Sequence, residues 1–127
     1  MSSELPSFSL AEANAVIDDL RRRLPAYREA RATMLAEAEV LRDRVAADGG
    51  GHDPGPAYRD AQEVVAALLR ELAERGVLLR DADPGLVDIP AERDGVPIYL
   101  CWREPEPSVG WWHPRDTGFA GRRPLEP

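Results

Sequence analysis

The sequence has 127 residues, a length typical of one domain, and a formal charge of −7 from 16 basic and 23 acidic side chains. A general nucleic-acid binder is not expected, because such proteins usually present a basic surface. No apolar run is long enough to span a membrane, and residues 1–10 lack the pattern of a secretory signal. The single cysteine excludes an internal disulfide framework and a CxxC zinc site. These features predict a cytoplasmic protein formed as a single domain over residues 1–127.

Residues 9–76 predict a helical hairpin. Ser9 and Glu12 have the spacing of a capping box, so the first helix is expected to begin near Leu10. From there a seam of positions recurs at steps of three and four, the heptad spacing, with one polar member: Leu10, Ala13, Ile17, Leu20, Leu24, Tyr27, Arg31, Met34, Ala38, Leu41 and Val45. Because this seam stays in phase through Pro25, we expect one long helix with a kink there.

The glycine- and proline-rich segment 48–56 ends the first helix, and a shorter antiparallel helix is expected from about Ala57 to Arg75, with a stop at Gly76. At about 1.5 Å per residue, the first helix is roughly 55 Å long and the second roughly 30 Å. The second helix can therefore cover only the C-terminal part of the first. Residues 10–24 must bury their apolar stripe against another element.

Residues 77–127 predict a small antiparallel sheet of three or four strands and a C-terminal turn region. The candidate strands are residues 77–80, 86–91, 96–102 and 109–113. Asp94-Gly95 is typical of a two-residue hairpin turn and pairs Arg93 with Val96. This register places six apolar residues on one face, namely Val87 opposite Trp102, Ile89 opposite Leu100 and Ala91 opposite Ile98. The predicted fold class is α+β, with this face packed under the first half of the long helix.

The other face of the sheet is polar and is the predicted position of a site. In the same register Asp88 lies opposite Cys101, with Tyr99 and Arg103 beside them. His113 shares this face in one register of the last strand and lies on the apolar face in the other, and the sequence leaves both registers open. The candidate ligand or metal face comprises Asp88, Tyr99, Cys101, Arg103, Glu106, Trp112 and His113.

Three kinds of chemistry fit these residues. Cys101 and His113 can form a nucleophile pair in which imidazole stabilises the thiolate, although a free cysteine in a strand more often packs as a small apolar residue. His113 can hold a transition metal together with Glu106, Asp116, Asp88 or Cys101, because such ions accept mixed nitrogen, sulfur and oxygen ligands. The clustered tryptophans and arginines suit a planar or anionic ligand, or else the indoles seal the core.

The sequence also resembles an uncharacterised prokaryotic family, the domain of unknown function number 2203. Six stretches in chain order carry the resemblance: FSLAEAN (8–14), GVLLRD (76–81), GLVDIPA (85–91), YLCWR (99–103), WH (112–113) and GFAGR (118–122). The family usually has a Gly-Glu pair soon after its Cys-Trp-Arg stretch, where this chain has Pro105-Glu106. The resemblance assigns no activity.

Two functions are compatible with these observations. The first is a small non-catalytic interaction or self-association module, a homo-oligomer formed through the seam from Tyr27 to Val45, which is longer than one short partner helix covers. The second is a metal- or anion-binding protein, with an enzyme among the alternatives, that uses the polar face of the sheet. The sequence does not indicate a particular cofactor or substrate.

Overall fold

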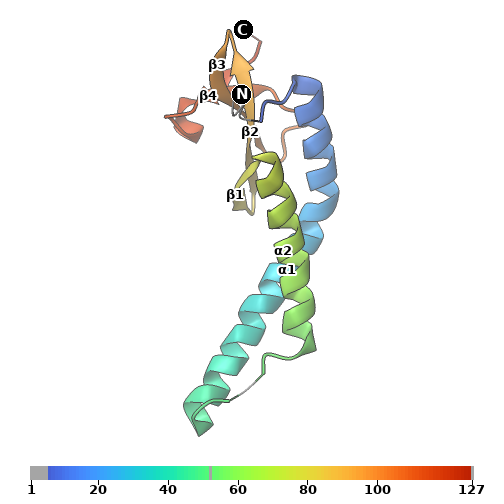
Figure 1. The fold of residues 1–127 in the computed structure, drawn as a ribbon, viewed down its shortest axis with the longest axis vertical. Coiled ribbons are helices and arrows are strands. Elements are labelled where there is room, and N and C mark those ends of the chain that lie inside the picture. The colour runs from blue at the N-terminus through green and yellow to red at the C-terminus, as the bar shows by residue number, and fades with distance from the viewer. Residues whose placement is uncertain (1–5, 52, 127) are drawn as a thin grey trace, which may run out of the picture. The chain divides into compact units, whose positions relative to one another are not determined.

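The structure, a computed structural model, describes residues 6–51 and 53–126 (Figure 1). It has the predicted α+β class, with two helices followed by an antiparallel sheet. The elements in chain order are α1 (Leu10–Asp48), α2 (Pro56–Arg75), β1 (Leu78–Ala82), β2 (Gly85–Arg93), β3 (Val96–Arg103), β4 (Trp111–Pro114), a short 3-10 helix (Phe119–Gly121) and β5 (Arg123–Pro124). The chain forms two compact units. One unit is Pro25–Arg70, and the other combines the segment that ends at Leu24 with the segment that begins at Glu71. The first part of α1 thus belongs to the same unit as the sheet.

Local signals in the sequence set the start of α1 and the end of α2. The predicted capping box is present: the Ser9 backbone N–H donates to Glu12 Oε1 at 2.8 Å, and the Glu12 N–H donates to Ser9 Oγ at 3.1 Å. α1 then continues through Pro25 without a break. At the end of α2, Gly76 has φ +73°, and the Val77 N–H donates to the Leu72 carbonyl at 2.9 Å. This left-handed closing turn explains why the helix stops at the glycine.

The unit Pro25–Arg70 is a pair of antiparallel helical segments joined by the glycine-rich connection (Figure 1). Tyr27, Ala30, Ala61 and Leu68 are buried. Further along the predicted seam the cover is less complete, because Met34, Ala38 and Leu41 are half-buried and Val45 is exposed. Across residues 6–51 and 53–126, neither helix combines the length and the apolar character needed to cross a membrane.

The sheet has five strands in the order β1-β2-β3-β4-β5, whereas three or four were predicted. The additional strand, β5, is only two residues long, too short to show an alternating pattern. The predicted β2–β3 register is confirmed, with Arg93 paired to Val96 and Asp88 to Cys101. Asp94 and Gly95 have φ +53° and +78°, the left-handed conformations that a tight turn of this kind requires.

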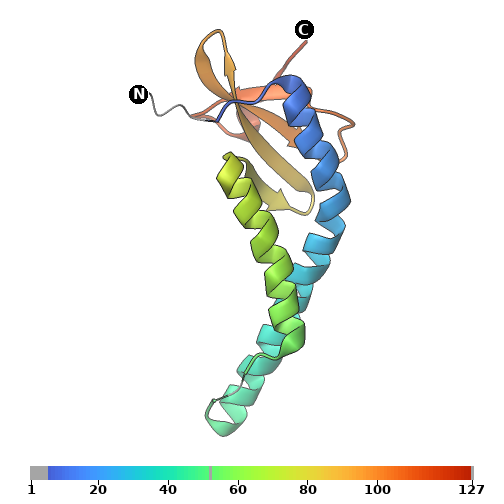
Figure 2. The same cartoon turned by 45° about the vertical axis from the view of Figure 1, so that its right-hand side comes forward.

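The apolar face of the sheet packs against the first part of α1, as the sequence predicted (Figure 2). The α1 residues on this side, Ile17, Leu20 and Leu24, are at most 1% exposed, and the sheet residues Val87, Ile89 and Trp102 are fully buried. Gly85 lies where this contact is tightest, since a Cβ added there would be 2.9 Å from Leu24 Cδ1. The core is therefore a two-layer contact that leaves the other face of the sheet free of the helix.

Candidate metal site

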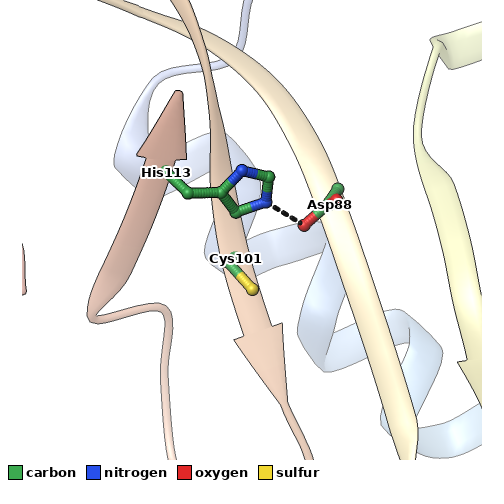
Figure 3. A group of neighbouring side chains, drawn as sticks. All are labelled: Asp88, Cys101 and His113. Atoms are coloured by element: carbon green, nitrogen blue, oxygen red, sulfur yellow. Dashed lines mark hydrogen bonds and ion pairs between the residues drawn. The ribbon is translucent and has the colours of Figure 1, made fainter. Parts of the chain in front are cut away.

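The register of β4 decides which side chains meet on the polar face of the sheet. Tyr99 pairs with His113, and Cys101 pairs with Trp111. Alternate residues of a strand share a face, so His113 lies on the same side as Cys101, and Asp88 lies there too as the β2 partner of Cys101. Asp88, Cys101 and His113 are 4%, 0% and 1% exposed, so three groups able to bind a metal are buried together (Figure 3).

The imidazole of His113 has an oxygen acceptor at each of its ring nitrogens. Nδ1 lies 2.7 Å from the Pro114 carbonyl oxygen, and Nε2 lies 2.9 Å from Asp88 Oδ1 (Figure 3). A carbonyl oxygen can only accept, so Nδ1 carries the hydrogen of this bond. At 2.9 Å, Nε2 and the Asp88 carboxylate are at hydrogen-bond distance and share one proton, and a metal ion takes the place of that proton only if the two atoms move apart.

Asp88 is held from its other side by an arginine. The pairing of β1 with β2 shifts register between Leu79 and Asp81, at Arg80. The Arg80 Nε–H donates to Asp88 Oδ2 at 2.9 Å. Both carboxylate oxygens thus have partners, which offsets the desolvation cost of a buried acid and fixes its orientation toward His113.

The Cys101 thiol lacks the surroundings of a nucleophile. Burial, the largest cause, and the nearby Asp88 carboxylate together raise the pKa of this thiol to about 12, with Arg122 acting in the opposite direction. A reactive cysteine needs a lowered pKa, whereas this thiol stays protonated near neutral pH. His113 directs its Nε2 at Asp88 and its Nδ1 at Pro114. The arrangement therefore does not support the cysteine–histidine nucleophile considered from the sequence.

The same geometry suits a metal ion. One ligand atom from each of Asp88, Cys101 and His113 lies within 4.8 Å of the other two. Ligand atoms around a tetrahedral zinc ion are separated by about 3.3–3.7 Å, given metal–ligand distances near 2.0–2.3 Å, so small side-chain rotations are enough to surround an ion. The carbonyl on Nδ1 and the arginine on the carboxylate are the outer contacts that orient metal ligands in proteins.

A pocket of about 340 Å³ opens beside this cluster. Its walls include Asp88 and Cys101, and the remaining lining residues are Arg80, Leu86, Thr117, Gly118 and Phe119. An ion held by three protein groups would therefore have space next to it for a further ligand.

The other candidate residues lie outside the cluster. Tyr99 is its neighbour, with a ring centroid 5.7 Å from that of His113. Arg103 is exposed at the end of β3, and Glu106 is engaged elsewhere, accepting from Arg122 Nη2 at 2.7 Å. Trp112 lies on the opposite, helix-facing side, because it pairs with Leu100 and neighbouring residues of a strand point to opposite faces. Its inclusion with His113 on one face was wrong.

Sequence reasoning missed Arg80 and Thr117. Arg80 falls in the predicted first strand, but only the β1–β2 register brings it beside Asp88, and no turn signal of the Asp-Gly kind sets that register. Thr117 belongs to the turn after β4 and reaches the pocket only through the path of that turn.

Comparison with known proteins gives a family but no activity. The family described as "Uncharacterized conserved protein (DUF2203)" matches residues 7–125. No curated protein and no solved structure matches the chain. The match covers both helices and all five strands, so it includes the whole polar face.

Proposed function

The chain belongs to the DUF2203 family of uncharacterized conserved proteins, and we propose that it binds a transition metal ion, with zinc the best fit, through Asp88, Cys101 and His113. The observation that carries the proposal is the convergence of three buried ligand groups within 4.8 Å, one offering oxygen, one sulfur and one nitrogen. Zinc accepts all three kinds of donor.

The charges around the cluster support a cation. A bound ion would replace the proton that His113 Nε2 and Asp88 Oδ1 share at 2.9 Å, and the two atoms would then move apart to the wider separation of metal ligands. It would also displace the thiol proton of Cys101, whose thiolate is otherwise disfavoured by burial. The neutral imidazole, one carboxylate and one thiolate would together balance the two charges of the ion.

The number of ligands favours a catalytic or transport ion over a purely structural one. Structural zinc sites are usually closed by four protein ligands, whereas catalytic sites keep one position for water or substrate. Among the described residues the cluster has three members, and the pocket adjoins it. A bound zinc ion in such a position lowers the pKa of its water and polarises oxygen ligands, which is the chemistry of hydrolytic metalloenzymes.

Metal analysis of untagged protein tests the proposal. We expect about one zinc per chain, and uptake of cobalt(II) with a thiolate-to-cobalt charge-transfer band, because a thiolate ligand produces one. Cys101→Ser should abolish that band and His113→Gln should weaken cobalt binding at least tenfold, as expected for loss of a ligand. Asp116→Asn is the matched control, since Asp116 is an exposed acid close in sequence and outside the cluster.

Two results would contradict the metal site. One is the absence of stoichiometric binding of either ion by folded wild-type protein. The other is equal cobalt affinity in wild type, His113→Gln and Asp116→Asn, because the ion would then be held elsewhere. Circular dichroism of each variant separates loss of a ligand from loss of the fold.

A second candidate function is self-association through the helical unit, with a second copy of the chain as the partner. Val45 at the end of the predicted seam is 41% exposed, and large apolar side chains outside the seam are also exposed on both helices, Leu35 at 64% and Val64 at 45%. Light scattering over a range of concentrations tests it, with Leu35→Ser/Val64→Ser expected to shift a dimer toward monomer. Wild-type protein that stays monomeric at every concentration would refute it, and Cys101→Ser serves as a control outside this unit.

A further inference from the structure

The pocket beside the cluster combines an open side of the proposed metal site with a cationic side chain. Asp88 and Cys101 line it together with Arg80, Thr117 and Phe119. Arg80 uses its Nε–H for Asp88, and within the described residues its Nη1 and Nη2 make no hydrogen bond or ion pair. Its side chain is 48% exposed, and its guanidinium carbon lies 5.7 Å from the Tyr99 ring centroid, which is an aromatic contact and leaves the N–H groups of Nη1 and Nη2 without an acceptor in the described part of the chain.

The charges in the pocket favour a negative ligand. A divalent ion would be neutralised by the Asp88 carboxylate and the Cys101 thiolate, which leaves the Arg80 guanidinium as an excess positive charge. Glu106 does not cancel that charge, because it is paired with Arg122 at 2.7 Å and does not line the pocket. A guanidinium and a metal ion together are a common means of binding two oxygens of one anion.

We infer that the natural ligand or substrate of this site carries an anionic group with at least two oxygens, a small oxyanion or a carboxylate. One oxygen would occupy the free coordination position of the ion, and another would accept from Arg80. Leu86 and Phe119 supply apolar wall on the same pocket, which can contact the remainder of such a ligand. This inference rests on the proposed metal site and adds the class of ligand and the residue that selects it.

The test uses the full chain loaded with one equivalent of cobalt(II), freed of excess ion by gel filtration. Inorganic phosphate and acetate are titrated separately, and the visible absorption bands of the bound cobalt report any change in its ligands. We expect saturable spectral changes with phosphate, acetate or both, and comparison of the two probes shows which class of oxygen anion the site prefers.

Arg80→Gln should weaken anion binding at least about tenfold at saturating cobalt, the effect of losing a hydrogen bond to a charged group. Arg22→Gln is the matched control, because it removes the same charge from an exposed position on α1. The cobalt affinity of each variant is measured first, so that an effect of Arg80 on Asp88 is separated from an effect on the anion.

The two proposals fail in different ways. A cobalt protein whose spectrum responds to neither anion, or an Arg80→Gln variant that binds the anion as tightly as Arg22→Gln, overturns the inference and leaves the metal site standing. Failure of the folded wild-type chain to bind cobalt overturns the metal site, and the inference with it.

Discussion

The contact between α1 and the sheet can be tested by adding one methyl group, in the variant Gly85→Ala. A Cβ at this position would lie 2.9 Å from Leu24 Cδ1 and 3.2 Å from a ring carbon of Trp102. Leu24 and Trp102 are both 0% exposed, so neither side chain can move into solvent to make room. The backbone is also constrained, because the Gly85 N–H donates to Glu104 Oε1 at 2.8 Å.

Overpacking of a tight core costs about 1–3 kcal/mol, and with both neighbours fully buried we expect a value in the upper half of this range. For a chain of this size, such a loss lowers the unfolding temperature by roughly 5–12 °C. Gly110→Ala is the matched control, because no atom lies within 4 Å of its added Cβ and its φ is not left-handed. That variant should be neutral, or more stable by up to about 1 kcal/mol through the lower entropy of its unfolded chain.

Urea unfolding followed by tryptophan fluorescence measures the difference, because all three tryptophans belong to the unit that contains the sheet. Gly85→Ala should shift the midpoint by about 1 M relative to Gly110→Ala, given a typical dependence of about 1–3 kcal/mol per molar urea. Equal midpoints for the two variants would refute the close approach of Leu24 and Trp102 to Gly85, and with it the packing of α1 on the apolar face of the sheet.

Three further predictions concern the elements that hold this unit together. Asn14→Ala should lower the free energy of unfolding by about 1–3 kcal/mol, because the buried Val109 N–H donates to Asn14 Oδ1 at 2.8 Å and would lose its acceptor. Asn14→Asp keeps an acceptor and should lower this free energy less, a difference that urea unfolding measures. Leu20→Ala should lower the free energy of unfolding by about 2–5 kcal/mol and Leu10→Ala by less than about 1 kcal/mol, because Leu20 is 1% exposed and Leu10, although a member of the predicted seam, is 46% exposed. Similar losses in urea unfolding would contradict the burial of α1 in the structure. The backbone N–H and the hydroxyl of Ser9 hold the pKa of Glu12 below its usual range. The stability that Glu12 contributes is therefore fully present above the pKa that this residue has in the unfolded chain, and it is lost as pH falls through the pKa in the folded protein. The stability difference between wild type and Glu12→Gln should therefore shrink between pH 6 and pH 2, and a difference that grows on acidification would contradict the capping box.

The sequence alone determined the features that depend on neighbouring residues. Ser9 and Glu12 mark the start of α1, Gly76 marks the end of α2, and Asp94-Gly95 pairs β2 with β3. A two-residue turn leaves no freedom in register, so the opposition of Asp88 and Cys101 followed directly from it.

Only the tertiary structure decided how the remaining strands meet. The connection from Arg103 to Trp111 is long enough to allow either parity of β4, so the face occupied by His113 depends on packing between distant residues rather than on a turn. The irregular pairing at Arg80 and the two-residue strand β5 likewise depend on contacts across the sheet. Residue types therefore indicated that Asp88, Cys101 and His113 were suited to a metal, whereas their convergence required the fold, because side-chain direction in a sheet reverses with each single-residue shift of register.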